Sequence, residues 1–178
     1  MRRSLITLLL CGALATVGIS ENLDISGWNK AKWGMTQEQV VRELPEATIH
    51  PPDQYSLKPF LAIDQYSIGA RKYAIKFAFD EAGELFRVEI LPEHKCSSCL
   101  REGGVAAEAA QSELLDLLKD KYGKASNSST EKDGNATHHL WEWIRTQGRI
   151  DLSYYEYPDW RSSFMSLVYY RRKESKAV

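Results

Sequence analysis

The sequence has few cysteines and almost no net charge. Three of its 178 residues are cysteine, and 23 basic side chains balance 24 acidic ones, for a formal net charge of −1. This balance removes the general electrostatic reason to bind nucleic acid or another polyanion. The chain is 43% hydrophobic, which is typical of a globular protein long enough to bury a sizeable core.

Sequence motifs for nucleotide binding and nucleophilic catalysis are also absent. The chain contains no GxSxG, HExxH, Walker or GxGxxG motif. Asp80, Glu81 and Glu84 cluster as in a solvated turn. The basic run from Arg171 to Lys173 is too short to indicate nucleic acid. We therefore expect a non-enzymatic protein with no cofactor, no metal and no nucleic-acid partner.

Residues 1–20 have the pattern of a cleavable secretory signal peptide. Two arginines precede an apolar run from Leu5 to Val17, which is too short for a comfortable membrane span. We expect cleavage after Ser20, and Ala13 and Ala15 offer an alternative, earlier cut. Cleavage after Ser20 lowers the net charge from −1 to about −3 by removing the two arginines. No later stretch is apolar for long enough to span a bilayer, so the protein is predicted to be periplasmic or secreted.

Beyond the signal peptide, the chain is predicted to form one helix followed by antiparallel strands, and then to repeat this order. Thr36 and Gln39 form a capping box at the start of the first helix, which Pro45 ends. The second helix is expected over 104–122, with Gly123 capping its end. Alternating apolar residues predict the strands, near 61–68, 72–79, 86–90, 137–146, 149–157 and 163–171. A polar loop is expected over 126–135.

These elements predict an α+β fold of two tandem helix-plus-antiparallel-sheet units. The first unit is placed at residues 21–95 and the second at 96–171, with a loose charged tail at 172–178.

The start of the first helix resembles the WGM(T/S)xxxV opening of many small exported bacterial proteins. It reads Trp28, then Trp33-Gly34-Met35-Thr36, then Glu38 and Val40. The element order is similar to that of SmpA/BamE-type outer-membrane assembly lipoproteins and of β-lactamase-inhibitor-protein-like domains. This resemblance implies a binding or scaffolding role without catalysis. It carries over no functional residue, because Leu10 precedes Cys11 where lipidation requires a small residue.

The mature chain keeps two cysteines, Cys96 and Cys99, after Cys11 is removed with the signal peptide. In an oxidising compartment, a disulfide that pins the turn between the two units is the default interpretation. A redox-active pair and a metal site that includes His94 are the alternatives. The redox-active pair is disfavoured because Gly103 and Gly104 are expected to separate the cysteines from the N-terminus of the helix, where a thiol pKa would be lowered. Haem attachment is excluded, because Leu100 follows Cys99 where c-type attachment requires histidine.

Aromatic residues are concentrated in the second set of strands, around adjacent histidines His138 and His139. Neighbours on a strand point to opposite faces, so only one histidine can serve any given site. By the same alternation, Trp141 and Trp143 share one face with His139, while Leu140, Glu142 and Ile144 share the other.

Both faces of this strand carry large apolar side chains, so something must cover one of them for both to be core. The alternative to a covered face is a recognition surface, because exposed Tyr and Trp are the usual anchors of protein interfaces. We therefore predict an exported binding or scaffolding protein whose partner is another exported or envelope protein. Its candidate binding residues are Trp141, Trp143, Tyr155 and Trp160, and a thiol-redox or metal-binding role of Cys96 and Cys99 is the alternative function.

Overall fold

The computed structural model describes residues 24–52, 58–92, 100–158 and 162–172. The helices in these ranges are α1 (Gln37–Glu43) and α2 (Leu100–Tyr122). The strands are β1 (Gly27–Trp28), β2 (Ala31–Lys32), β3 (Thr48–His50), β4 (Phe60–Ile68), β5 (Arg71–Phe79), β6 (Leu85–Pro92), β7 (Asn127–Asp133), β8 (Ala136–Ile144), β9 (Gly148–Tyr157) and β10 (Ser162–Arg171). The predicted signal peptide lies outside the described residues. Neither described helix combines the length and apolar character that crossing a bilayer requires.

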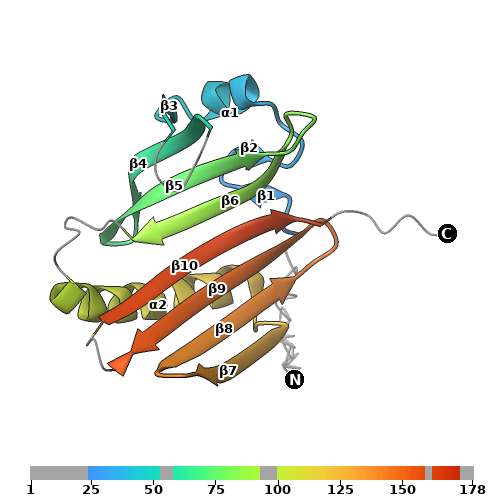
Figure 1. The fold of residues 1–178 in the computed structure, drawn as a ribbon. Helices are drawn as coiled ribbons and strands as arrows, with labels where there is room; N and C mark the ends of the chain where they lie inside the picture. The colour runs from blue at the N-terminus through green and yellow to red at the C-terminus, as the bar shows by residue number, and fades with distance from the viewer. Residues whose placement is uncertain (1–23, 53–57, 93–99, 159–161, 173–178) are drawn as a thin grey trace, which may run out of the picture.

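The prediction of two tandem units is wrong, because one eight-stranded antiparallel sheet contains strands from both parts of the chain. The strand order is β3-β4-β5-β6-β10-β9-β8-β7, so the predicted ranges 21–95 and 96–171 contribute neighbouring halves of the same sheet (Figure 1). The chain does run twice from a helix into strands. The two sets of strands meet at β6 and β10, which pair from Ile90 opposite Leu167 to Arg87 opposite Tyr170. The molecule is therefore mostly antiparallel sheet, with helices on one face.

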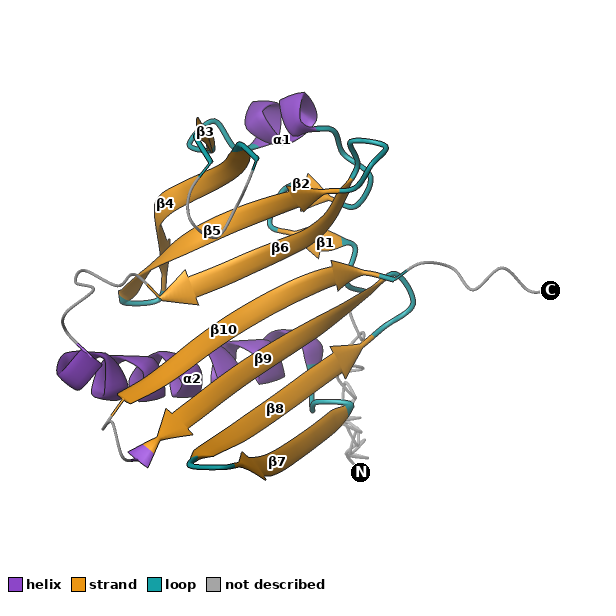
Figure 2. Cartoon of the chain, in the orientation of Figure 1, coloured by secondary structure: helices purple, strands orange, loops and turns teal. Residues whose placement is uncertain are grey.

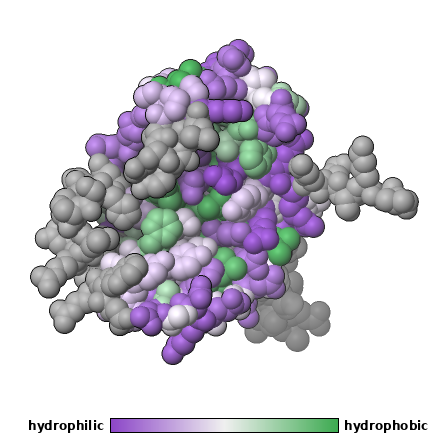
Figure 3. Space-filling model, viewed as in Figure 1, coloured by the Kyte–Doolittle hydropathy of each residue, from purple (hydrophilic) through white to green (hydrophobic). Residues whose placement is uncertain are grey.

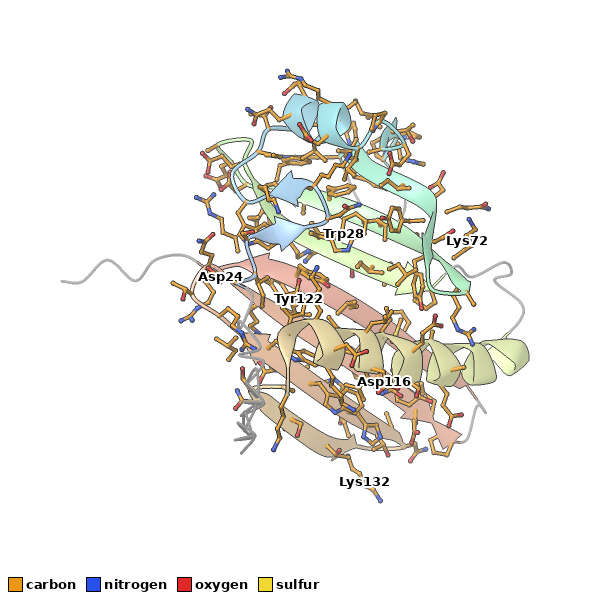
Figure 4. All side chains as sticks on the ribbon, turned by 180° about the vertical axis from the view of Figure 1, so that it is seen from behind. Asp24, Trp28, Lys72, Asp116, Tyr122 and Lys132 are labelled. Carbon is orange, nitrogen blue, oxygen red and sulfur yellow. The ribbon has the colours of Figure 1, made fainter. Side chains whose placement is uncertain are left out.

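A single hydrophobic core lies between this sheet and the elements that cover one of its faces (Figure 2). Helix α2 crosses behind β9 and β10, and Figure 4, seen from behind, shows it in front of them. Its sheet-facing side chains recur every three or four residues and are buried: Ala107, Ala110, Leu114, Leu118 and Tyr122. Near the middle of α2, Glu113 accepts hydrogen bonds from the backbone of Ala70 and the side chain of Arg71, which fixes the helix to the β4–β5 turn.

The N-terminal residues cover the other half of the same face. Trp28, in the β1–β2 hairpin, packs edge-on against Tyr66 of β4 with ring centroids 4.9 Å apart (Figure 4). Ile25 is fully buried beside Gly148, and its carbonyl oxygen accepts a hydrogen bond of 2.7 Å from the indole of Trp33. Helix α2 lies against β9 and β10 and does not extend over β4 to β6. The β1–β2 hairpin and α1 cover that part of the core instead.

The residues that resemble the WGMT opening have a structural role in this hairpin and helix. Gly34 has a φ of 83°, a left-handed backbone conformation that favours glycine. Its N–H donates a hydrogen bond to the carbonyl oxygen of Leu85 in β6, and the N–H of Leu85 donates to the carbonyl oxygen of Met35. Thr36 then begins α1 with the predicted capping box, in which Gln39 reaches back to the backbone of Thr36. The expected capping box is therefore confirmed.

Two local predictions are corrected by the structure. The expected polar loop at 126–135 is a strand, β7, whose seven residues are all exposed and pair with β8. Helix α2 begins at Leu100 and runs through Gly103 and Gly104, so the glycine pair does not separate Cys99 from the helix. In both places secondary structure continues through residues with weak intrinsic preference for it, because pairing or helix propagation decides the outcome.

Candidate functional site

Trp143, predicted as a binding residue, is a core residue instead. It lies opposite Ile150 on the helix side of the sheet and has no exposed surface. Its indole nitrogen donates a hydrogen bond of 2.8 Å to the carbonyl oxygen of Gly123, just beyond the end of α2. Arg145 donates to the carbonyl of Tyr122 in the same turn. Trp143 therefore helps to hold the helix terminus against the sheet, and a partner cannot reach it.

Trp141 lies on the same helix side, opposite Leu152, and is half-buried at the margin of the core. The faces of β8 are divided as the alternation predicts, with Trp141, Trp143 and His139 together. Tyr155 lies on the other face, opposite His138. The structure therefore separates Tyr155 from both tryptophans. Trp160, Cys96 and Cys99 lie outside the described residues.

We call the face that α2 does not cover the open face. It is the face toward the viewer in Figure 1, and Figure 3 shows it as mainly hydrophilic with small separate hydrophobic patches. The strand register places neighbours on it row by row, so that Tyr155 lies between His138 of β8 and Phe164 of β10. Tyr157 follows Tyr155 on the same face of β9. This row is the largest concentration of rings that the register assigns to the open face.

The four residues His138, Tyr155, Tyr157 and Phe164 form what we call the aromatic cluster. The His138 and Tyr155 rings stack with centroids 4.1 Å apart and planes 4° from parallel. Tyr155 also lies 6.4 Å from the rings of both Tyr157 and Phe164. Such ring pairs stabilise one arrangement of the side chains before any partner binds. The cluster is thus a preorganised surface at the end of β9.

The cluster is accessible in the described part of the chain. Phe164 exposes 39% of its surface, which is unusual for a phenylalanine. The His138 imidazole adds a polar atom, since its Nε2 is buried and has no hydrogen-bond partner among the described residues. An exposed phenylalanine ring in a row of stacked aromatic side chains is a surface that a partner can cover.

The rest of the open face is occupied by charges that pair with one another. Arg149 contacts both Glu142, at 2.7 Å, and Asp151, at 2.5 Å. Across β10, Arg87 and Glu89 form a second, longer pair at 3.5 Å. Two arginines thus face three carboxylates in this row, so most of its charge is paired and one negative charge is left in excess.

Partial burial sets the ionisation of this charge row. It raises the pKa of the Asp151 carboxyl, against the opposing effect of its hydrogen bonds from Arg149. The hydrogen bond to Asp151 in turn raises the pKa of the Arg149 guanidinium. Arg149 therefore favours the ionised form of Asp151 and opposes the effect of burial.

A wide cleft lies at the opposite end of the sheet, where β10 ends. Its lining is mixed, with Trp33, Phe79 and Phe86 beside charged residues. Arg171 is engaged with Glu84 at 2.6 Å, and Arg172 donates to the carbonyl of Arg145. Both arginines of the cleft are therefore already engaged with groups of the protein. In the described ranges, no group of three His, Cys, Asp or Glu residues could hold a metal ion.

Sequence reasoning missed His138, Tyr157 and Phe164 as members of one surface. The available signal was the two-residue alternation itself, which places His138 away from Trp141. Residue type points the other way, because tryptophan is a common interface anchor and favours Trp141 and Trp143 as binding residues. The pairing of Tyr155 with Phe164 requires the β9–β10 register, which alternation along one strand does not specify.

Comparisons with known proteins provide one structural likeness. No family model matches the chain, and no curated protein matches its sequence. A DUF4309 family protein, YjgB from Bacillus subtilis, has a similar structure over 77% of this chain and 78% of its own, with 10% sequence identity and a TM-score of 0.37. At this level of similarity, the likeness does not bear on what this chain does.

Proposed function

We propose that this protein is exported and binds another exported or envelope protein through the aromatic cluster on its open face. The observation that carries the proposal is the stacked, partly exposed row of His138, Tyr155 and Phe164 on a face that no described element covers. On this view the protein acts by contact alone and performs no catalytic step. Export rests on the signal-peptide pattern of residues 1–20.

The chemistry of the cluster favours a protein partner. Tyrosine rings supply large contact areas with few rotatable bonds, which is why they are frequent anchors at interfaces. Phe164 supplies the apolar surface, and the Tyr155 ring lies between it and the Tyr157 ring in ring contact with both. The paired charges of Arg149 and Asp151 then form a polar rim along the same strand. A partner segment with an apolar side chain and neighbouring hydrogen-bonding groups fits this arrangement.

The test begins with photo-cross-linking at two matched positions in the producing cell. A photoreactive phenylalanine analogue replaces Phe164 in one variant and Leu117 in another. Leu117 is an equally exposed apolar residue, at 43% against 39%, but lies on α2 and away from the open face. We expect a discrete adduct from position 164 and none from position 117. Mass spectrometry of the adduct identifies the partner, which is then purified.

Affinity for the purified partner decides the proposal. Tyr155→Ala is expected to weaken binding by about tenfold or more, as for a central interface anchor. Leu117→Ala is expected to leave the dissociation constant unchanged. Equal affinity of Tyr155→Ala and the parent, both folded by circular dichroism, would overturn the proposal, as would adducts from position 117 alone.

A further inference from the structure

Strand β7 presents a long free edge at one end of the sheet. No strand of the described chain pairs with its outer side, and all seven of its residues are exposed. The opposite edge strand, β3, has only three residues and is followed directly by Pro51 and Pro52, which lack the N–H that pairing needs. The two edges therefore differ, since proline and short length protect β3 and neither protects β7.

The hairpin turn fixes which backbone groups of β7 point outward. Gly134 and Asn135 form a two-residue turn, with Gly134 at φ 58, so Asp133 and Ala136 form its closing hydrogen-bonded pair. Hydrogen-bonded and non-hydrogen-bonded pairs alternate along an antiparallel ladder. Ser128, Thr130 and Lys132 therefore direct their backbone N–H and C=O groups to the free edge, while the residues between them bond to β8.

We infer that the free edge of β7 pairs antiparallel with β7 of a second copy of this chain. A two-fold axis through Thr130 uses the full length of both strands and places no like charges opposite each other. In this register the facing pairs are Asn127 with Asp133, Ser128 with Lys132, and Ser129 with Glu131. Shifting the axis toward the turn would instead place Glu131 opposite Glu131 or Lys132 opposite Lys132, which is unfavourable.

The symmetric register makes a second copy the fitting occupant. An isologous interface requires a surface that is complementary to itself, and the sequence NSSTEKD satisfies this at every position. About six backbone hydrogen bonds cross such a pair, and small serine and threonine side chains leave the edge unobstructed. The dimer has one continuous sheet with both open faces on the same side. This inference is independent of the proposed function, although it brings two aromatic clusters onto one surface.

Sedimentation equilibrium of the purified protein tests the inference. A strand pair alone is a small interface, so dimers are expected at about 0.1–1 mM protein. Thr130→Pro removes an outward N–H without removing a bond to β8 and is expected to abolish the dimer. Thr130→Val keeps that N–H and should dimerise like the parent. A protein that stays monomeric throughout this concentration range overturns the inference.

Charge substitutions at Ser129 test the register without a proline. Ser129→Glu places a carboxylate opposite Glu131 of the second copy, whereas Ser129→Lys places an ammonium there. Two symmetry-related pairs change in each variant, so we expect the dimer dissociation constant to rise about fivefold with Ser129→Glu and fall about fivefold with Ser129→Lys. Equal dimer dissociation constants for Ser129→Glu and Ser129→Lys would overturn the proposed β7 register. Loss of partner binding by Tyr155→Ala is a separate measurement, so either proposal can fail without the other.

Discussion

The two faces of the eight-stranded sheet have the same strands but opposite roles, as the adjacent tyrosines of β9 illustrate. Tyr154 lies on the helix side, exposes 6% of its surface, and has its pKa raised by burial. Tyr155 lies on the open face and stacks on His138. The residue type is identical, so the face alone decides whether the ring stabilises the core or remains available. Aromatic content therefore identifies a binding surface only after the covered face is known.

The first prediction concerns the largest fully buried ring on the helix side of the sheet, the covered face. Trp143→Ala deletes a fully buried indole and the hydrogen bond to the carbonyl of Gly123. We expect the free energy of unfolding to fall by about 3–5 kcal/mol, the usual cost of truncating a buried tryptophan. Urea denaturation followed by circular dichroism measures it. A loss below about 1 kcal/mol would show that Trp143 is not part of the core.

The second prediction concerns alkaline pH and Tyr73, a fully buried residue of the covered face. Burial raises the pKa of the Tyr73 phenol to about 12, whereas tyrosine in an unfolded chain ionises near pH 10. Ionisation therefore favours the unfolded chain. The contribution of Tyr73 to stability is complete below pH 10 and is lost as the pH rises toward 12, by up to about 3 kcal/mol.

The variant Tyr73→Phe isolates this contribution. Unfolding free energies measured from pH 8 to 11.5 should fall less steeply for Tyr73→Phe than for the parent. At pH 8 the variant should be at least as stable, because the Tyr73 hydroxyl has no hydrogen-bond partner among the described residues. Parallel pH profiles would contradict the assignment of this loss to Tyr73.

A smaller effect is expected on the charged part of the open face. Arg149→Gln leaves Glu142 and Asp151 close together without their shared cation. Because Arg149 is partly exposed, water screens the change, and we expect a loss of about 1 kcal/mol at pH 7. The pKa of Asp151 is already raised by burial, so protonation at lower pH relieves the repulsion. The difference from the parent should shrink between pH 7 and 4, and growth over this range would refute the explanation.

The smallest change in stability is expected at the exposed ring of the aromatic cluster. Phe164→Ala removes surface that is already 39% exposed and leaves the covered face intact. We expect a loss of less than about 1 kcal/mol in the free energy of unfolding, well below that of Trp143→Ala. Thermal denaturation of Phe164→Ala, Trp143→Ala and the parent in the same buffer compares the two losses of stability. A larger loss from Phe164→Ala would mean that the open face also stabilises the fold.

Local elements were predictable from the sequence because each has a local physical signal. The alternation of Tyr73, Ile75 and Phe77 predicts β5, and the capping box of Thr36 and Gln39 predicts the start of α1. Strand β7 has no apolar residue to alternate, so its pairing with β8 alone makes it a strand. Sequence patterns of this kind report the preferences of a segment and miss strands that depend on a neighbour.

The joining of the two halves into one sheet was not predictable by the same reasoning. The β6–β10 pair joins residues such as Ile90 and Leu167, which are far apart in the chain, and no local pattern specifies their register. The choice of covered face was also undetermined, because each face of β8 mixes large apolar and charged or polar side chains. Only the position of α2 decides which face is covered, so the sequence alone could not show that Trp143 is core and that His138 lies on the open face.

The most direct test of the central claim compares Trp141→Ala with Tyr155→Ala for both stability and affinity toward the cross-linked partner. The two residues lie on neighbouring strands but on opposite faces of the sheet. We predict that Trp141→Ala lowers the free energy of unfolding and leaves the dissociation constant unchanged. Tyr155→Ala should weaken binding by about tenfold or more with little loss of stability. The reverse result, with binding lost only in Trp141→Ala, would contradict the assignment of the binding surface to the open face.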